Sequence, residues 1–415
     1  MKLTIIIIFA AFTITWSQPN SVYSKYGLGL NEYSNSARNA GMGDLGVSVL
    51  DRDYISTINP ALWGTINLTR AEFTQNFTAS FTGNESSTNY KGNSYFGGFS
   101  LAFPVSTDYG ATVALGLSRS SIVSYNFAEN GVFPPSNQGT GIPYQLNYEG
   151  EGGLSRLFLG SSINLPFGFI SGASLDFYIG QFNYISEIKA GNTNYAGGEL
   201  VNTSNIKGIS GSFGLITPNL LEKLELVEGQ DFRIGVSLNL DAKLTGDSLY
   251  YKSTGGFEDS VSNGDRTVNV PGRFLIGVAY KPNDNVSVYA DFLSQNWANY
   301  SENSITLPYF QSSMKLSAGI EYIPSKRFGT DRELYAYRAG ISYEKTPFLV
   351  KGEELNQLSI SLGFSYLIST ANSLDFALKY SKIGKTSNNL ISEHNFRFVV
   401  SLNIGELWFI RSDRF

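Results

Sequence analysis

The chain has 415 residues, a net charge of −5, one histidine and no cysteine. The absence of cysteine excludes disulfides, cysteine-ligated zinc and a thiol nucleophile, and a single histidine excludes a multi-histidine metal centre. A mildly acidic chain is also unsuited to nucleic acid, which needs clustered lysine and arginine. Charged residues make up 16% and aromatic residues 14%, against about 25% charged residues in typical soluble domains. Together with 43 glycines, this composition favours a membrane β-barrel.

Residues 1–17 have the composition of a secretory signal peptide. Lys2 precedes an apolar run over 3–14, and small residues come before Gln18. The run is too short for a helix that spans a membrane. We therefore predict a signal peptide over 1–17, cleavage before Gln18, and an exported protein.

Residues 18–65 are rich in glycine and small side chains and have no sustained alternation of apolar and polar residues. The segment is too short to build a hydrophobic core of its own and too apolar for a disordered tail. We predict that it forms a hatch that fills the lumen of a barrel. The alternative is a loosely ordered leader.

From residue 66 to residue 415 apolar and polar residues alternate in segments of strand length. In one example Leu358, Ile360 and Leu362 alternate with Ser359 and Ser361. Period-2 alternation indicates strands, and a tilted strand needs about 9–11 residues to cross hydrocarbon. Closing such strands into a barrel pairs every backbone group without an edge. The predicted fold is all-β, a 14-stranded antiparallel transmembrane β-barrel with an N-terminal hatch in the lumen, whose strands lie at 66–82, 91–104, 109–122, 153–165, 169–184, 203–217, 230–246, 268–281, 285–300, 310–323, 333–345, 355–368, 372–383 and 392–404.

The connections between these strands alternate in length. Short turns such as 105–108 alternate with long polar stretches such as 123–152 and 184–202, which we predict to be loops. Outer-membrane barrels have short periplasmic turns and long extracellular loops, so both chain ends should be periplasmic. The stretch 218–229 departs from this pattern, because it lies on the short side yet contains LLEKLELVEG; we expect one or two helical turns. A soluble propeller or sandwich is the alternative fold, but the chain has no fixed-period repeat.

Three motifs in the hatch carry a family resemblance. They are GLGLNEYS from Gly27, RNAGMG from Arg38, and Asn59-Pro60-Ala61. This ordered set resembles the start of the long-chain fatty-acid transporter family, which includes FadL and TodX. The resemblance implies a 14-stranded barrel with a lumenal hatch, in which the motif residues are Glu32, Gly41, Gly43, Asn59, Pro60 and Ala61.

Two further stretches, SVYSKYGLG near the start and GELWFIR near the end, resemble a Bacteroidetes-type branch of that family. A distant relative of this branch, PorV, works in protein secretion. In the fatty-acid transporters the free N-terminus lies near the bound ligand. Here the extra residues 18–26 precede the family-like start, so the N-terminus should be displaced.

The resemblance also implies candidate sites. In the family a gap in the wall forms at a kink in the third strand. The matching positions here are Gly97 and Gly98 in the second strand and Ser118, Arg119 and Ser120 in the third, where the alternation breaks; they could equally be strand ends. Aromatic residues in the expected loops would capture a hydrophobic ligand or anchor the barrel at the interface, and these are Tyr125, Phe127, Phe133, Tyr144 and Tyr148.

Enzyme chemistry has little support in the sequence. His394 is the only histidine, and it lies beside Ser392 and Glu393 at the start of the last predicted strand. A general base must lie within hydrogen-bond reach of its nucleophile. Here only the closeness of His394 and Ser392 in the sequence suggests such a contact. Asp51, Arg52 and Asp53 could form a cation site, but such a stretch is more often a solvated turn or an ion pair between hatch and wall. We predict no enzymatic activity, no catalytic residue, no metal and no cofactor.

The main functional hypothesis is passive uptake of hydrophobic, fatty-acid-like molecules through the outer membrane of a Gram-negative bacterium. A ligand would be captured by loops, held in a lumen pocket and released by the hatch or a lateral gap. The alternative is a binding or scaffold subunit of a protein secretion or surface-assembly complex. A non-specific porin is a weaker third hypothesis, because the hatch would obstruct it. An apolar lumen path favours transport, whereas a sealed lumen with an exposed patch favours a partner protein. The expected partners are outer-membrane lipid, a hydrophobic ligand or such a complex, and not nucleic acid.

Overall fold

The computed structural model describes residues 21–83, 88–133, 141–190, 197–254, 257–324, 334–385 and 391–406. The predicted signal peptide and the last residues of the GELWFIR stretch lie outside these ranges. Within them the strands form one antiparallel sheet that closes on itself. The closing pair is β19 (Ser392–Glu406) with β2 (Thr69–Gly83), whose register runs from Ser392 opposite Gly83 to Glu406 opposite Thr69.

The barrel wall has 14 strands, which confirms the predicted fold. Two wall strands are each interrupted once, so that β8 continues into β9 along β7, and β10 continues into β11. The wall strands between β2 and β19 are β3 (Thr88–Ser106), β4 (Ala111–Phe133), β5 (Ile142–Asn164), β6 (Ile170–Ala190), β7 (Gly198–Ile216), β8 (Asp231–Asn239), β9 (Ala242–Thr254), β10 (Phe257–Val270), β11 (Arg273–Lys281), β12 (Val286–Asn296), β15 (Ser312–Tyr322), β16 (Tyr335–Val350), β17 (Glu353–Leu367) and β18 (Ser373–Ile383).

The two faces of the wall are inverted relative to a soluble protein. On β15 the apolar side chains Leu316 and Ile320 are exposed, whereas Lys315, Ser317 and Glu321 are buried inside. Strict alternation places one set toward lipid and the other toward the lumen. The period-2 pattern in the sequence follows directly from this arrangement.

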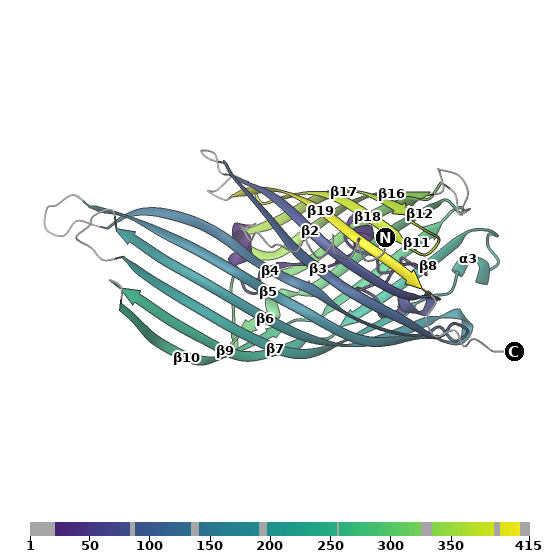
Figure 1. The fold of residues 1–415 in the computed structure, drawn as a ribbon, viewed down its shortest axis with the longest axis horizontal. Helices are drawn as coiled ribbons and strands as arrows, with labels where there is room; N and C mark the ends of the chain where they lie inside the picture. Colours follow the sequence, from purple (N-terminus) through teal and green to yellow (C-terminus); the bar gives the residue numbers. More distant parts are fainter. Residues whose placement is uncertain are drawn as a thin grey trace.

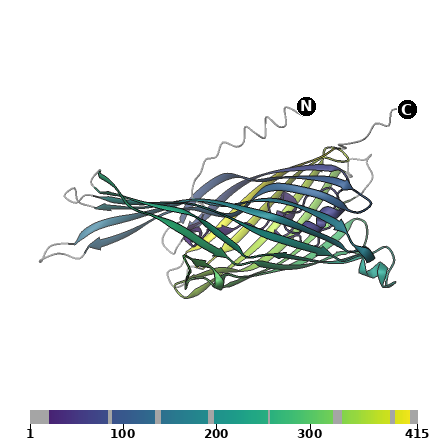
Figure 2. The ribbon, with the colours of Figure 1, turned by 90° about the horizontal axis from the view of Figure 1, so that it is seen from below.

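The predicted loops 123–152 and 184–202 are wrong for most of their length. β4 and β5 have 23 residues each, whereas β12 and β15 have 11 each. The strands from β4 to β10 therefore continue as a paired sheet beyond the end of the opposite wall (Figures 1 and 2). We call this part the extended sheet, and it comprises residues 125–133, 142–150, 184–190, 198–202, 249–254 and 257–262. On β5 the alternation continues through Tyr144, Leu146 and Tyr148, whereas on β4 it is lost after Phe127, so the sequence pattern predicted a loop where paired strands are present.

The opposite end of the barrel has most of the tight turns. One of them is η3 (Pro166–Gly168), and the predicted helical turn after β7 is confirmed as α3 (Leu220–Lys223). The alternation of connection lengths is not strict, because Lys351 and Gly352 alone join β16 to β17 at the extended-sheet end. No helix in the described ranges is long and apolar enough to cross a membrane. Short elements between β12 and β15 are η4 (Trp297–Asn299), β13 (Ser301–Glu302) and β14 (Ile305–Thr306).

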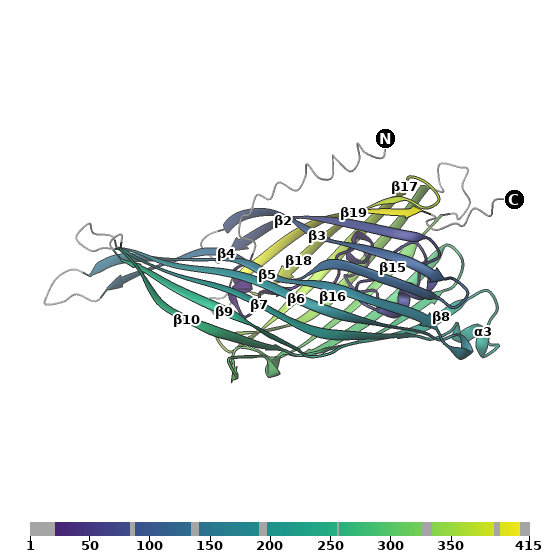
Figure 3. The ribbon, with the colours of Figure 1, turned by 60° about the horizontal axis from the view of Figure 1, so that its bottom comes forward.

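The N-terminal segment lies inside the barrel, as predicted for a hatch (Figure 3). Most of its residues between 21 and 66 are buried. Its regular structure is limited to short pieces, namely η1 (Val22–Lys25), β1 (Leu30–Asn31), α2 (Ala37–Ala40) and η2 (Pro60–Thr65).

Candidate functional site: the hatch, the lumen and the end of β3–β4 pairing

The Asn-Pro-Ala motif closes the short-turn end of the lumen. Asn59 caps η2 by accepting a hydrogen bond from the Ala61 N–H at 3.0 Å, and its amide donates to the Val47 carbonyl at 2.7 Å. The wall makes room for this motif with glycines. A β-carbon on Gly214 would lie 1.9 Å from the Asn59 side-chain oxygen, and one on Gly172 would lie 2.4 Å from the Pro60 carbonyl carbon. Hatch backbone therefore packs directly on wall backbone.

The second motif packs on wall glycines in the same way. A β-carbon on Gly41 would lie 2.8 Å from the α-carbon of Gly363 on β17. A β-carbon on Gly340 of β16 would lie 2.4 Å from the Gly43 nitrogen. Since Gly43 has a φ of 91°, it also occupies a backbone conformation that other residues rarely adopt. The predicted motif glycines Gly41 and Gly43 thus lie where the hatch packs closely on the wall.

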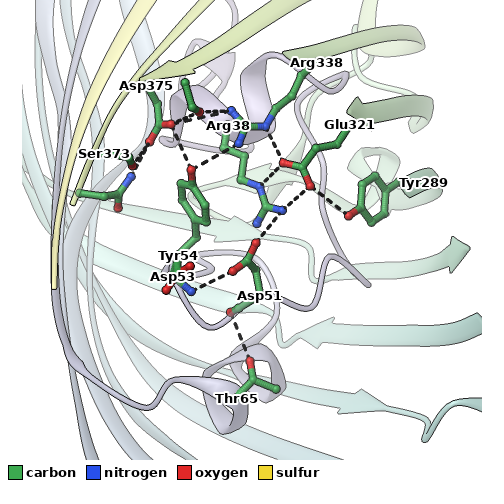
Figure 4. A network of polar contacts seen from close by, with 12 residues as sticks. Arg38, Asp51, Asp53, Tyr54, Thr65, Tyr289, Glu321, Arg338, Ser373 and Asp375 are labelled. Atoms are coloured by element: carbon green, nitrogen blue, oxygen red, sulfur yellow. Dashed lines mark hydrogen bonds and ion pairs between the residues drawn. The ribbon is translucent and has the colours of Figure 1, made fainter. Parts of the chain in front are cut away.

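A buried network of charges fixes the hatch to β15 and β16 (Figure 4). The Arg38 guanidinium donates to Glu321 at 3.0 and 2.8 Å and lies 2.9 Å from Asp51. Arg338 donates to the same Glu321 carboxylate at 2.7 Å. The Tyr54 ring lies under Arg38, with 4.4 Å between the guanidinium carbon and the ring centroid. Each buried charge thus has an opposite charge in contact, which a low-dielectric site requires.

Asp44 makes a second ionic contact between hatch and wall. Its carboxylate lies 2.9 Å from the Lys315 ammonium and also contacts the Lys379 ammonium. Burial by itself would raise the pKa of the Asp44 carboxyl, but the two lysines hold it well below its ordinary value. Asp44 is therefore ionised at neutral pH and links the hatch to both β15 and β18.

A cavity of about 100 Å³ lies between the hatch and the wall. Its lining combines apolar residues with ionisable side chains, and the ionisable ones include Glu32, Asp44, Lys315, Glu344, Lys379 and Arg397. The Arg397 guanidinium donates to the Glu32 carboxylate at 2.7 Å. A hydrophobic ligand in this cavity would remove water from charged groups without replacing their hydrogen bonds. The cavity is thus poorly suited to a hydrocarbon.

The other half of the lumen is filled by aromatic side chains. Tyr23 and Leu28 of the hatch join a buried apolar cluster with Trp297, Tyr300 and Phe310 of the connection between β12 and β15. The Tyr300 and Phe310 rings pack with centroids 4.6 Å apart. The Tyr23 hydroxyl donates to the Ile391 carbonyl at 2.5 Å. Residues 21–31 of the hatch are held here by apolar packing and single hydrogen bonds, while the ion pair of this half, Arg266 with Glu302, joins β10 to β13.

The wall is incomplete between β3 and β4. Their pairing stops at Gly98 opposite Ser118, although both strands continue toward the extended sheet. The register between β4 and β5 shifts between Arg119 and Ser121, which leaves Ser120 as an extra residue on β4. The register between β2 and β3 shifts in the same way at Gly97. The five residues of the candidate lateral gap therefore lie where this pairing ends.

The hatch covers the edge of β4 that β3 leaves unpaired. Leu30 and Asn31 of β1 pair antiparallel with Ile122 and Ser121 of β4. The N–H groups of Ser21, which precedes η1, and of Glu32, which directly follows β1, donate to β4 carbonyls at 3.0 and 2.9 Å. The hatch therefore replaces part of the missing strand.

The predicted ligand-capture residues lie on paired strands rather than loops. Tyr125, Phe127 and Phe133 are on β4, and Tyr144 and Tyr148 are on β5. Their rings form contacts across the two strands, with centroids 5.2 Å apart for Phe127 and Tyr148 and 4.3 Å apart for Phe133 and Tyr144. They build the extended sheet, and a role in ligand capture stays a prediction.

Residues weighed for chemistry have structural partners. A ring nitrogen of His394 shares a 2.7 Å hydrogen bond with the Tyr380 hydroxyl on the neighbouring strand. Asp51 pairs with Arg38, and Asp53 pairs with Arg70 of β2. Within the described ranges no group of three or more metal-ligating side chains is present.

Comparison with known proteins places the chain in a family. The BamG family model matches residues 1–414. The chain belongs to the BamG family. No curated protein sequence matches it.

Solved structures similar to this BamG-family barrel are FadL-type channels. A Pseudomonas aeruginosa FadL homologue has a TM-score of 0.62 at 13% identity, covering 90% of this chain and 99% of the homologue. The Pseudomonas putida toluene transporter TodX has a TM-score of 0.58 at 15% identity, with 91% and 99% covered. The CymD monoaromatic hydrocarbon channel has a TM-score of 0.57 at 16% identity, with 92% and 99% covered. At these identities the likeness establishes the shared fold.

Sequence reasoning missed the charges that fix the hatch of this BamG-family barrel. Arg38 and Asp44 stand within or beside the glycine motif, but their partners Glu321, Lys315 and Lys379 are hundreds of residues away. One signal was available, because a charged residue on the inner face of a predicted strand needs a partner. That signal identifies Lys315 and Glu321 as unusual without identifying what they contact.

Proposed function

We propose that this chain is an accessory barrel of the outer-membrane β-barrel assembly (Bam) machinery, which binds a partner and passes no solute. The family name associates its members with that machinery. The observation that carries the proposal is the closed lumen, in which buried ion pairs hold the hatch and the cavity is lined by charges. A fixed plug around a polar cavity suits a scaffold better than a channel for hydrophobic molecules.

The extended sheet adds a second argument for a partner. It projects beyond the opposite wall (Figure 2). It also bears exposed apolar side chains on several strands, including Val132, Leu200, Tyr250 and Tyr251. Exposed apolar groups outside the hydrocarbon favour contact with another macromolecule. We place the barrel in a Gram-negative outer membrane, with the short turns and the C-terminal end of β19 toward the periplasm, and infer a role without a catalytic step. The first described residue, Ser21, bonds to Ser124 near the extended-sheet end, so the expectation that both chain ends lie on the short-turn side does not fit the N-terminal segment. The Bacteroidetes-type branch rests on the two terminal motifs alone.

The test is native purification of the tagged full chain from outer membranes in mild detergent. We expect a complex of defined stoichiometry that contains the central barrel subunit of the Bam machinery. We also expect that deletion of the gene slows membrane insertion of a reporter barrel. A monomeric barrel with a bound fatty-acid adduct and no effect on insertion would contradict the proposal.

A second candidate function is passage of hydrophobic molecules, favoured by the end of β3–β4 pairing at Gly98. Release of the β1 segment would connect the lumen to lipid at that point. The similar structures are described as a toluene transporter and a hydrocarbon channel, which supports this candidate by likeness of fold. On this hypothesis, replacing Asn59 and Pro60 reduces uptake of a fluorescent fatty acid into proteoliposomes while the barrel still folds. Uptake equal to that of protein-free vesicles would exclude it.

A further inference from the structure

The loop between β7 and β8, residues 217–230, is unusual for the short-turn end. It projects from the barrel at the end opposite the extended sheet (Figures 1 and 2). All residues from 222 to 229 are exposed, and Leu224 and Leu226 are 63% and 64% exposed. Apolar side chains displayed together on a surface often mark an interaction site.

Hydrogen bonds define the backbone of the loop although Leu224 and Leu226 are largely exposed. The Asn219 side-chain oxygen accepts hydrogen bonds from the N–H groups of Leu221 at 3.2 Å and Phe232 at 3.1 Å, and its amide donates to the Gln230 carbonyl at 2.8 Å. The Leu226 N–H donates to the Leu221 carbonyl at 2.9 Å. Backbone and Asn219 thus hold the loop in shape, so the exposed leucines are free to contact a partner.

The neighbouring turn adds an aromatic side chain to the same surface. Phe167 is 79% exposed and has a φ of 66°, a conformation uncommon for a bulky residue. The Lys223 ammonium donates to the Phe167 carbonyl at 2.6 Å and lies 5.1 Å from the ring centroid. Lys223 therefore joins the two connections into one surface, which we call the short-turn patch and define as Phe167, Leu224, Leu226 and Val227.

The charges around the short-turn patch indicate what covers it. Glu222, Glu225 and Glu228 are all exposed, whereas the one lysine of the loop already contacts the neighbouring turn. Segments that lie on a membrane surface carry lysine and arginine on their polar face, and anionic lipids repel carboxylates. An acidic rim around apolar side chains instead complements a protein groove with apolar walls and a basic rim.

We propose that the short-turn patch docks into a basic-rimmed apolar groove on a periplasmic domain of the Bam machinery. This inference rests on the proposed function and on the orientation given there. Leu224 and Leu226 would enter the groove, and the three glutamates would pair with its rim.

The experiment uses single cysteines, because the natural chain has none. Full-length barrel with Leu226→Cys is labelled with an environment-sensitive fluorophore and placed in nanodiscs of phosphatidylethanolamine and phosphatidylglycerol. Phe213→Cys on β7, which is 50% exposed on the wall, is the lipid-facing control. We expect water-like emission at position 226 and lipid-like emission at position 213. Lipid-like emission at position 226 would identify a membrane anchor and overturn the proposal.

Purified Bam complex lacking this chain is then added. We expect a blue shift at position 226 and none at position 213. Leu224→Ser with Leu226→Ser, measured by retention of the complex on immobilised nanodiscs, should weaken binding about tenfold. Glu222→Lys, Glu225→Lys and Glu228→Lys together should weaken it similarly, and more so at low salt. Asp108→Lys, an exposed charge reversal in the turn between β3 and β4 and outside the short-turn patch, should bind like the natural chain.

The outcomes separate this inference from the proposed function. If the complex binds the natural chain and every loop variant equally, without a shift at position 226, the docking proposal is wrong and the Bam role stands. If the complex does not bind the natural chain at all, both are wrong. Loss of binding confined to the loop variants supports both.

Discussion

The two halves of the hatch are held in the lumen by different kinds of interaction. Around Arg38, Asp44 and Asn59, buried ion pairs and backbone packed on wall glycines fix the hatch. From Ser21 to Asn31, by contrast, the hatch is held by aromatic packing and by hydrogen bonds to the unpaired edge of β4, and the Glu32–Arg397 ion pair marks where this half ends. Removing one partner of a buried ion pair leaves an unpaired charge, whereas edge hydrogen bonds can be exchanged for bonds to water. The first half should therefore behave as a permanent plug and the second as a segment that can detach.

The largest expected effect comes from Asp44→Asn. The substitution leaves the Lys315 and Lys379 ammonium groups buried without their shared carboxylate. We expect the free energy of unfolding to fall by about 3–5 kcal/mol. Urea titration of the barrel in lipid vesicles, followed by heat-modifiable gel mobility, measures this loss.

The matched control is Glu354→Gln. Glu354 accepts from the Lys345 ammonium at 2.6 Å in a pair that is largely exposed. An exposed pair contributes at most about 1 kcal/mol. Equal losses for the two variants would show that the buried pairs do not fix the hatch.

A smaller effect is expected where the hatch packs on wall glycines. Gly214→Ala forces its β-carbon to within 1.9 Å of the Asn59 side-chain oxygen, so the Asn-Pro-Ala motif must shift. Overpacking of this kind costs about 1–3 kcal/mol. Gly211→Ala on the same strand is the control, since its nearest neighbours would be 3.6 Å away. The same urea titration checks both, and a Gly214→Ala barrel as stable as Gly211→Ala would contradict close packing of the motif.

The detachable half should respond differently to an equally severe clash. Gly29 has a φ of 90°, and a β-carbon there would lie 2.1 Å from the Ile122 carbonyl oxygen. We expect Gly29→Val to detach the segment while the free energy of unfolding falls by less than about 1 kcal/mol, as for a locally opening region. A fluorophore on Lys25→Cys should then report a water-like environment. A loss as large as that of Asp44→Asn would remove the distinction between the two halves.

The same contrast explains what could be predicted from the sequence. Leu358 and Ser359 alternate because one faces lipid and the other the lumen, so all 14 strands were predictable. Beyond the hydrocarbon that constraint ends, and the β4–β5 pairs from Tyr125 to Phe133 escaped detection. The motif glycines were visible as a pattern. The Asp44–Lys315 contact, which joins residues 271 positions apart, has no local signal in a single sequence.

The smallest expected effect is a pH dependence confined to the detachable half. Burial, helped by the nearby Glu393 carboxylate, raises the pKa of the Tyr23 phenol to about 12 from its ordinary 10.0. Because the neutral form is favoured in the folded protein, its contribution to stability is complete below pH 10 and is lost as the pH rises from 10 to about 12. Above that range the phenolate can no longer donate to the Ile391 carbonyl, and the segment should detach.

The fluorophore on Lys25→Cys should therefore shift toward water-like emission across that window. Tyr23→Phe removes the titrating group, so its emission should change less over the same range. Tyr109→Phe, at a site 70% exposed, is the control. Its emission should change with pH as it does in the parent protein, which is the labelled Lys25→Cys barrel with Tyr23 unchanged. If the Tyr23→Phe and parent profiles coincide, then Tyr23 does not hold this half, and the aromatic cluster around Phe310 would have to hold it through apolar contact alone.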